Sequence, residues 1–210
     1  ELVWSKPWDQ VIDDSEKPFY RWFVGGETNI VANAVDRHIT GPRKNKLALL
    51  WRSEDNKETR TFSYFSLNRE VVKMANILRA MGVEKGDRVT IYLPRIPEVV
   101  FAMLACAKLG AIHSVVFAGF SADALSSRID DSESKLVITA DGSWINGSVF
   151  PLKDIVDEAV RFSPTVENVI VVRRTGTEVH MDSTRDHWYH DLESLPIARG
   201  ACPTVQVDAE

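Results

Sequence analysis

The fold is indicated most clearly by the stretch Ile112-His-Ser-Val-Val-Phe-Ala-Gly-Phe-Ser-Ala-Asp-Ala-Leu-Ser-Ser-Arg128. Its first part, which ends at Val115-Val116-Phe117, is typical of a buried strand, and Ser121 is placed to cap the helix that follows. Ala118-Gly119 stands between them, where no bulky side chain blocks a ligand. In a parallel α/β sheet, ligands approach the carboxyl ends of the strands. The stretch therefore predicts a strand, a turn that a ligand can approach, and a helix, without naming the ligand.

The neighbouring sequence repeats this alternation of strand and helix. The predicted strands are Arg88–Leu93, Ile112–Phe117, Lys135–Ala140 and Val169–Val172. The predicted helices are Pro97–Leu109, Ser121–Ile129 and Pro151–Phe162. Apolar strands that alternate with helices favour a mostly parallel sheet with helices on both faces. We therefore predict an α/β fold.

Two β-prone runs and a helix precede this alternation. Leu47–Arg52 and Thr59–Tyr64 flank a polar turn and predict a hairpin. Apolar residues at helical spacing then predict a helix that Ser66 caps and Gly82 ends. We assign residues 46–193 to the first, incomplete α/β subdomain of a larger domain.

The two ends of the chain differ in composition from this subdomain. Residues 1–45 hold one predicted helix and many aromatic side chains, which are seldom left in water. The aromatic residues are Trp4, Trp8, Phe19, Tyr20, Trp22 and Phe23. We expect residues 1–45 to be an N-terminal arm that wraps a larger body. Residues 194–210 have the composition of a linker.

The bulk composition argues against some classes of function. The 210 residues carry a net charge of −5, whereas a surface that tracks nucleic-acid phosphates needs a basic excess. No apolar run reaches the roughly 18 residues of a membrane span, and the first residues lack the pattern of a signal peptide. Cys106 and Cys202 predict no disulfide framework. We expect a cytoplasmic protein with neither a membrane nor a nucleic-acid partner.

Two patterns could carry chemistry, and each has a simpler interpretation. Gly142-Ser-Trp-Ile-Asn-Gly147-Ser148 has the glycine spacing of a phosphate-binding loop but lacks the lysine, so an ordinary loop between strand and helix is the simpler prediction. His187 and His190 lie at a spacing that zinc can use on a helix, but further ligands are not evident and packing onto the body is the simpler explanation. No Gly-x-Ser-x-Gly nucleophile motif occurs. We predict no catalytic residue and no metal site in this chain.

Four segments together resemble the AMP-forming acetyl-CoA synthetases, short-chain acyl-CoA ligases of the adenylate-forming superfamily. The segments are Trp22-Phe-Val-Gly-Gly-Glu-Thr-Asn29, Asp36-Arg37-His38, Ile112 to Arg128, and Arg185-Asp-His-Trp-Tyr-His-Asp-Leu192. The resemblance runs from about Pro18 to Glu210, and the ordered set carries it rather than any single motif. It implies that the chain is the N-terminal fragment of such an enzyme.

The resemblance also implies a set of CoA-binding positions. Phe117 and Gly119 match the family positions that meet the adenine of CoA. Ile145 and Ser148 match two positions at which the family typically offers arginines to the 3′-phosphate of CoA, yet neither residue is charged. Either another residue supplies the charge, or CoA is held differently, or the thiol acceptor is not CoA.

The remaining machinery of such an enzyme is expected beyond Glu210. The resemblance implies ATP, CoA and Mg²⁺ for the intact enzyme, with a loop for the ATP phosphates, an acyl pocket and a C-terminal domain in the missing part. The substrate would be a short-chain carboxylate. We expect that this truncated chain holds none of these ligands tightly and does not catalyse the reaction alone. The alternative is a non-catalytic α/β module that binds a nucleotide or CoA.

Overall fold

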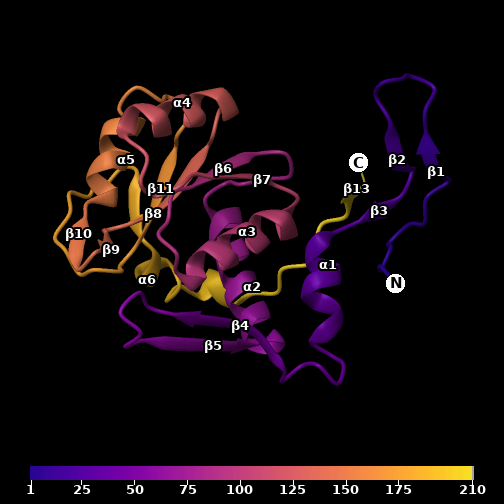
Figure 1. Ribbon diagram of the computed structural model, residues 1–210, viewed down its shortest axis with the longest axis horizontal. Helices are drawn as coiled ribbons and strands as arrows, with labels where there is room; N and C mark the ends of the chain where they lie inside the picture. Colours follow the sequence, from indigo (N-terminus) through magenta and orange to yellow (C-terminus); the bar gives the residue numbers. More distant parts are fainter. Residues whose placement is uncertain (210) are drawn as a thin grey trace.

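The computed structural model describes residues 1–209 and is built around a five-stranded sheet (Figure 1). The strands are β6 (Arg88–Ile91), β7 (Ile112–Val115), β8 (Leu136–Ala140), β11 (Asn168–Val172) and β12 (Asp186–Trp188). They pair in the order β12–β11–β8–β6–β7, and every pair is parallel. The predicted α/β fold with a mostly parallel sheet is confirmed.

Helices cover both faces of the sheet, as predicted (Figure 1). The helices α2 (Tyr64–Ala80) and α3 (Pro97–Leu109) pack together on one face, and α4 (Ala122–Ser132) and α5 (Leu152–Val160) pack together on the other. The central strand β8 is buried along its whole length, which is typical of a parallel strand between two helical layers.

The helix ends follow local sequence signals. Ser121 caps α4 as predicted, because its side chain accepts a backbone N–H of the first turn. Pro97 stands in the first turn of α3, and Gly110 ends that helix with φ at +71°. The cap of α2 is Ser63 and not Ser66. The Ser63 hydroxyl accepts the Ser66 N–H at 3.2 Å, so Ser66 lies inside the first turn.

Three strands of the five-stranded sheet differ from the prediction by more than one residue. β6 ends at Ile91 and β7 at Val115, because tight turns follow in which the Ile96 N–H donates to the Pro94 carbonyl and the Gly119 N–H to the Phe117 carbonyl. β12 was not predicted. It has three residues, and its place beside β11 depends on contacts with the distant helix α5 that are described below.

The predicted hairpin before α2 is confirmed. It consists of the antiparallel strands β4 (Leu47–Arg52) and β5 (Thr59–Ser63), which contact α2. The Trp51 indole Nε1 donates to the carbonyl oxygen of Arg95 at 2.6 Å. This bond links the hairpin to the loop that follows β6.

The N-terminal arm extends away from the sheet in Figure 1. It comprises the hairpin β1 (Gln10–Asp13) and β2 (Arg21–Val24), then β3 (Glu27–Thr28), α1 (Ile30–Ala34) and the 3₁₀ turn Asp36–His38. The rings of Trp4, Trp8 and Phe23 pack on one another at 4.8–5.4 Å, while Phe19 is 77% exposed. Within residues 1–209 the hairpin therefore packs its aromatic rings locally, whereas the sequence predicts that it wraps a body.

The C-terminal segment runs back to this arm. It contains a 3₁₀ turn at Pro196–Arg199 and the strand β13 (Val207–Asp208), which pairs antiparallel with β3. The buried Asn29 side chain donates from Nδ2 to the carbonyl oxygens of Ala107 and Val205, both at 2.7 Å. One amide thus joins the arm, α3 and the C-terminal segment. Glu210, the last residue of the predicted linker, lies outside the described residues.

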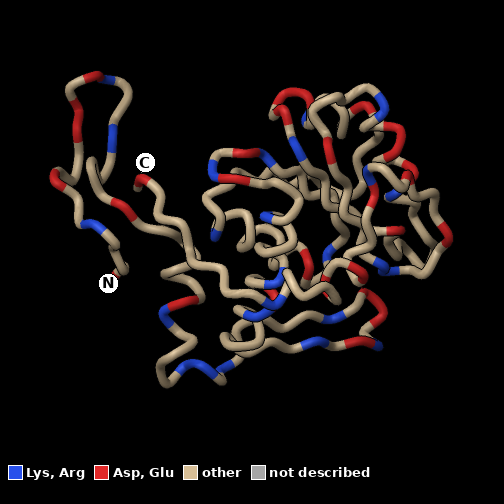
Figure 2. The backbone as a smooth tube through the Cα atoms, turned by 180° about the vertical axis from the view of Figure 1, so that it is seen from behind, with Lys and Arg blue, Asp and Glu red and all other residues tan. Residues whose placement is uncertain are grey.

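Charged residues of both signs are mixed along the chain (Figure 2). Among residues 1–209, the structure contains no helix with the length and apolarity that crossing a membrane requires.

Candidate functional site

The connections of the sheet change sides between β6 and β8. The chain passes from β6 into α3 and from β8 toward α5, and these two helices lie on opposite faces (Figure 1). Neighbouring strands whose connections leave toward opposite faces mark a switch point, and open α/β sheets bind ligands outside the carboxyl ends of such strands. The loops after β7, β6 and β8 follow one another along this edge and form the candidate site.

Phe117 and Gly119 lie in one tight turn after β7. The Gly119 N–H donates to the Phe117 carbonyl at 2.8 Å, and a Cβ at Gly119 would meet the Phe117 ring at 2.6 Å. The missing side chain therefore makes room for the ring, which is 60% exposed. The Phe120 ring stands edge-on to it, with 6.0 Å between the centroids. The structure brings these two predicted residues together as an exposed aromatic platform.

Residues from two neighbouring segments, the loop after β6 and the helix α4, contact Phe120 of this platform. Tyr92, which follows β6 and is fully buried, donates from its hydroxyl to the Phe120 carbonyl at 2.8 Å. Burial raises the pKa of Tyr92 to about 12, so the hydroxyl stays a donor at neutral pH. On α4, the Arg128 guanidinium lies 4.6 Å from the Phe120 ring centroid and donates to the Ala124 carbonyl.

Residues 143–150 form a third hairpin where the sequence analysis predicts a loop. The strands β9 (Ser143–Ile145) and β10 (Ser148–Phe150) are joined by Asn146-Gly147, whose φ angles are +50° and +77°. Two positive φ values define a type I′ turn, which Asn-Gly favours. The phosphate-loop alternative is therefore wrong, since the glycines serve a strand pair and do not lead into a helix. Ile145 and Ser148 stand directly opposite each other across the two strands.

The base of this hairpin is fixed by Asp141, a buried residue that sequence reasoning missed. Its carboxylate accepts four backbone N–H groups, those of Gly142, Arg174, Thr175 and Gly176, at 2.7–3.0 Å. The turn after β11 is thereby clamped to the first residue of the hairpin segment. A Cβ at Gly142 would meet Thr175 Oγ1 at 3.0 Å, so the two segments are in close contact.

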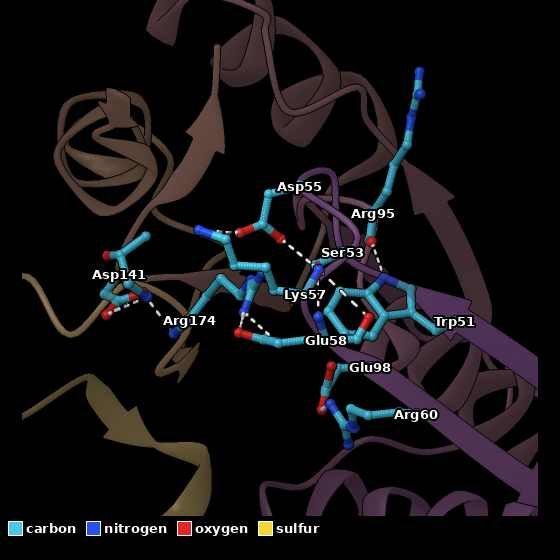
Figure 3. A network of polar contacts seen from close by, with 11 residues as sticks. Trp51, Ser53, Asp55, Lys57, Glu58, Arg60, Arg95, Glu98, Asp141 and Arg174 are labelled. Atoms are coloured by element: carbon cyan, nitrogen blue, oxygen red, sulfur yellow. Dashed lines mark hydrogen bonds and ion pairs between the residues drawn. The ribbon is translucent and has the colours of Figure 1, made fainter. Parts of the chain in front are cut away.

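Arg174 joins the same turn to the β4–β5 hairpin (Figure 3). Its Nη1 donates to Glu58 Oε2 at 3.0 Å, and its guanidinium lies 5.2 Å from the Trp51 ring centroid. At the other end of the segment, Glu54 Oε1 accepts the Asn146 N–H at 3.3 Å. Both the base and the tip of β9–β10 are therefore tied to the body.

His187 and His190 belong to different elements. His187 lies in β12, where its Nε2 is 3.1 Å from Asn168 Oδ1. His190 lies in α6 (Tyr189–Leu192), where its Nε2 is 3.4 Å from Asp191 Oδ1. The common helix on which the zinc alternative depended is therefore not formed. Within residues 1–209, no three His, Cys, Asp or Glu side chains converge as metal ligands.

Sequence reasoning also missed a buried ion-pair network, which joins β12 to α5. Lys153 Nζ contacts Asp186 Oδ2 and Asp157 Oδ1, both at 2.7 Å, and Arg185 Nε contacts Asp186 Oδ1 at 2.6 Å. The Lys153 and Asp186 side chains are fully buried. Burial by itself raises the pKa of Asp186, but hydrogen bonds from Arg185 and Lys153 outweigh it and lower the pKa below its usual value. The network attaches β12 to α5 and is structural.

A pocket of about 280 Å³ lies beside β11 and α6. Its lining includes Arg60, Glu70, Glu98, Tyr189, His190 and Glu193. The charges compensate one another, because Arg60 pairs with Glu98 at 2.7 Å and Lys73 pairs with Glu70 and Glu193. The Tyr189 hydroxyl is buried without a hydrogen-bond partner among residues 1–209. The balanced charges favour no class of ligand, so the carboxyl edge is the better candidate.

Known proteins match this chain along its whole length. The AMP-binding enzyme family matches residues 35–206, and the family described as the acetyl-coenzyme A synthetase N-terminus matches residues 1–34. The acetyl-coenzyme A synthetase of Chlorobaculum tepidum is 47% identical over 210 residues, which are 100% of this chain and 31% of that protein. The acetyl-coenzyme A synthetase of Methanothrix thermoacetophila is 50% identical over 207 residues, which are 99% and 31%.

A solved structure shares the fold. The acetoacetyl-CoA synthetase from Streptomyces lividans has a TM-score of 0.86 and 30% sequence identity, over 98% of this chain and 30% of that chain. The chain thus spans about a third of the length of the relatives it matches. With two consecutive families covering residues 1–206, the chain belongs to the AMP-binding enzyme family and corresponds to the N-terminal part of acetyl-coenzyme A synthetases.

Proposed function

We propose that this chain is the front part of an ATP-dependent, AMP-forming acetate–CoA ligase. The observation that carries the proposal is the match to proteins named acetyl-coenzyme A synthetase at 47% and 50% identity over 210 and 207 residues. In this reaction a carboxylate oxygen attacks ATP to give an acyl-adenylate and pyrophosphate. The CoA thiolate then attacks the acyl carbon, giving the thioester and releasing AMP. The substrates are short-chain carboxylates such as acetate or propionate.

The role proposed for residues 1–209 is to form one wall of the CoA channel. The exposed Phe117 ring can stack on an adenine, an interaction worth about 1–3 kcal/mol per base. The β9–β10 hairpin, with Ile145 and Ser148 at its turn, lies two strands away along the same edge. No residue of this chain is assigned a catalytic role, so the wall contributes binding and orientation.

The other ligands belong to the rest of the protein in this proposal. Mg²⁺ would assist the reaction by neutralising phosphate charge, but no cluster of carboxylates suited to it occurs among residues 1–209. We therefore assign no residue of this chain to Mg²⁺. The acyl pocket and the ATP phosphate loop would belong to the remaining part of the large domain, which a C-terminal domain follows. We further propose that the enzyme is cytoplasmic and that this chain alone does not turn over.

The test compares the intact protein with the 210-residue chain. With acetate, ATP, Mg²⁺ and CoA, the intact protein is expected to form acetyl-CoA and AMP in equal amounts, and the short chain neither. Pyrophosphate exchange into ATP should depend on acetate and not on CoA. An intact protein that binds CoA but forms no thioester would instead be the non-catalytic α/β binding module.

The CoA wall has a test of its own. Because Ile145 and Ser148 are a cross-strand pair, the double substitution Ile145→Arg and Ser148→Arg places two guanidinium groups side by side. This variant is expected to lower the KM for CoA, because arginine forks bind phosphate strongly. The KM for dephospho-CoA should not change. If both thiols respond equally, the hairpin does not contact the 3′-phosphate.

A further inference from the structure

The proposed CoA wall lacks a cation in the two segments that form it. Residues 117–121 and 142–150 contain no lysine or arginine. Two nearby arginines are already engaged, since Arg174 pairs with Glu58 and Arg128 stacks on Phe120. A phosphate at this edge therefore needs a positive charge from another loop.

Arg95 lies in the loop between the two segments. It follows β6, which stands between β7 and β8 in the sheet, so its loop is flanked by the Phe117 turn and by the β9–β10 hairpin. Neighbouring strands are about 4.8 Å apart, so each flanking loop starts only one strand away from the loop of Arg95. The same loop follows β6 at the switch point between β6 and β8, where the connections leave toward opposite faces.

The backbone of Arg95 is fixed while its side chain is not engaged. The Arg95 carbonyl accepts the Trp51 indole N–H at 2.6 Å, and its neighbours Pro94 and Ile96 are buried. The side chain is exposed and extends away from Trp51 and from the ion pairs around it (Figure 3). Among residues 1–209 the guanidinium has no hydrogen bond, ion pair or aromatic contact. A guanidinium presented on a rigid backbone is suited to grip a phosphate with two N–H groups.

We propose that the Arg95 guanidinium binds the 3′-phosphate of CoA at the carboxyl edge of the sheet, between the Phe117 turn and the β9–β10 hairpin. This inference rests on the proposed function and names the cation that Ile145 and Ser148 do not supply. Arg95 would thereby determine the preference for CoA over thiols without a 3′-phosphate. It takes no part in bond making or breaking.

The test measures the KM for CoA and for dephospho-CoA in the intact enzyme. The variants are Arg95→Gln, Arg95→Lys, Arg128→Gln and the control Arg161→Gln. Arg161 is also exposed, but it caps the far end of α5, at the amino edge of the sheet. Arg95→Gln is expected to raise the KM for CoA about tenfold, the effect of losing a hydrogen bond to a charged group. The kcat and the KM for dephospho-CoA should stay unchanged, and Arg95→Lys should recover part of the preference.

The outcomes separate this inference from the proposed function. The role proposed for Arg95 is contradicted if the enzyme makes acetyl-CoA but Arg95→Gln keeps the full preference for CoA over dephospho-CoA. It is also contradicted if only Arg128→Gln loses that preference. If the intact protein forms no thioester, the proposed function is wrong. Titration of the intact protein with CoA and with dephospho-CoA, two nucleotides that differ only in the 3′-phosphate, then tests Arg95 directly. Equal binding of both nucleotides, or a preference that Arg95→Gln leaves intact, would overturn the assignment.

Discussion

Asp186 and Asp141 are buried carboxylates at the ends of two strands of the same sheet, but different groups stabilise them. Asp186 begins β12 at the amino edge, where its carboxylate contacts the Lys153 ammonium and the Arg185 guanidinium. Asp141 follows β8 at the carboxyl edge, where four backbone N–H groups bind it and no cation of residues 1–209 pairs with it. The charged partners of Asp186 attach the strand β12 to α5. The backbone N–H groups that bind Asp141 fix the position of the β9–β10 hairpin in the candidate site.

The largest effect is expected from removing a charged partner of Asp186. Lys153→Met leaves the Asp186 carboxylate buried with only part of its compensation, and breaking a buried pair in this way costs about 3–5 kcal/mol. Lys135→Met is the matched control, because Lys135 pairs with Asp87 at 3.5 Å in a partly exposed position, where a pair is worth about 0–1 kcal/mol. Urea unfolding of the chain at neutral pH measures both. Equal losses would show that burial does not set the strength of the Lys153 network.

The same network predicts a dependence of stability on pH. The pKa of Asp186 is lower in the folded chain than its usual value of 3.8, because hydrogen bonds from Arg185 and Lys153 outweigh the effect of burial. A lowered pKa contributes stability that is present above the unfolded pKa and is lost as the pH falls through the folded pKa. The free energy of unfolding should therefore fall less steeply with acid in Asp186→Asn than in the parent chain. Parallel curves below about pH 4 would contradict the lowered pKa.

A smaller loss is expected at the carboxyl edge. In Asp141→Asn an NH₂ group replaces one acceptor oxygen, so one or two of the four backbone N–H groups lose their partner, at a cost of about 1–3 kcal/mol. Amide hydrogen exchange should accelerate at Gly142, Thr175 and Gly176. Asp87→Asn is the control, since Asp87 accepts a single backbone N–H, that of Glu84, at 2.9 Å. If hydrogen exchange at residues 142–150 is unchanged in Asp141→Asn, the hydrogen bonds of Asp141 do not hold this hairpin in place.

Local patterns predicted most of the fold. The apolar strands, the Ser121 cap and the extent of the helix Pro97–Leu109 follow from short-range signals, because burial and capping depend on neighbouring residues. The strand β12 escaped prediction because its position depends on Lys153 and Asp186, which are distant in sequence and meet only in the folded chain. The sequence around either residue does not indicate whether its ion pair is buried or exposed.

The sequence predicted less of the candidate site than of the fold. The turn at Ala118-Gly119 was recognised because small residues follow a strand, although Phe117 was assigned to the strand and lies in the turn. The β9–β10 hairpin had a usable signal, since Asn146-Gly147 between two β-prone triplets is a strong indication of a two-residue hairpin turn. The clamp at Asp141 had none, because its partners are backbone N–H groups and no side-chain pattern marks them.

The smallest effect is expected where the carboxyl edge uses a charged pair at the surface. Glu58 is 56% exposed, so Glu58→Gln should cost no more than about 1 kcal/mol in urea unfolding. Arg174 would still stack on Trp51, and its backbone N–H would still be bound by Asp141. Hydrogen exchange at residues 142–150 should therefore be the same in Glu58→Gln as in the parent chain. If Glu58→Gln loosens the hairpin as much as Asp141→Asn does, the ion pair and not the backbone clamp fixes this edge of the sheet.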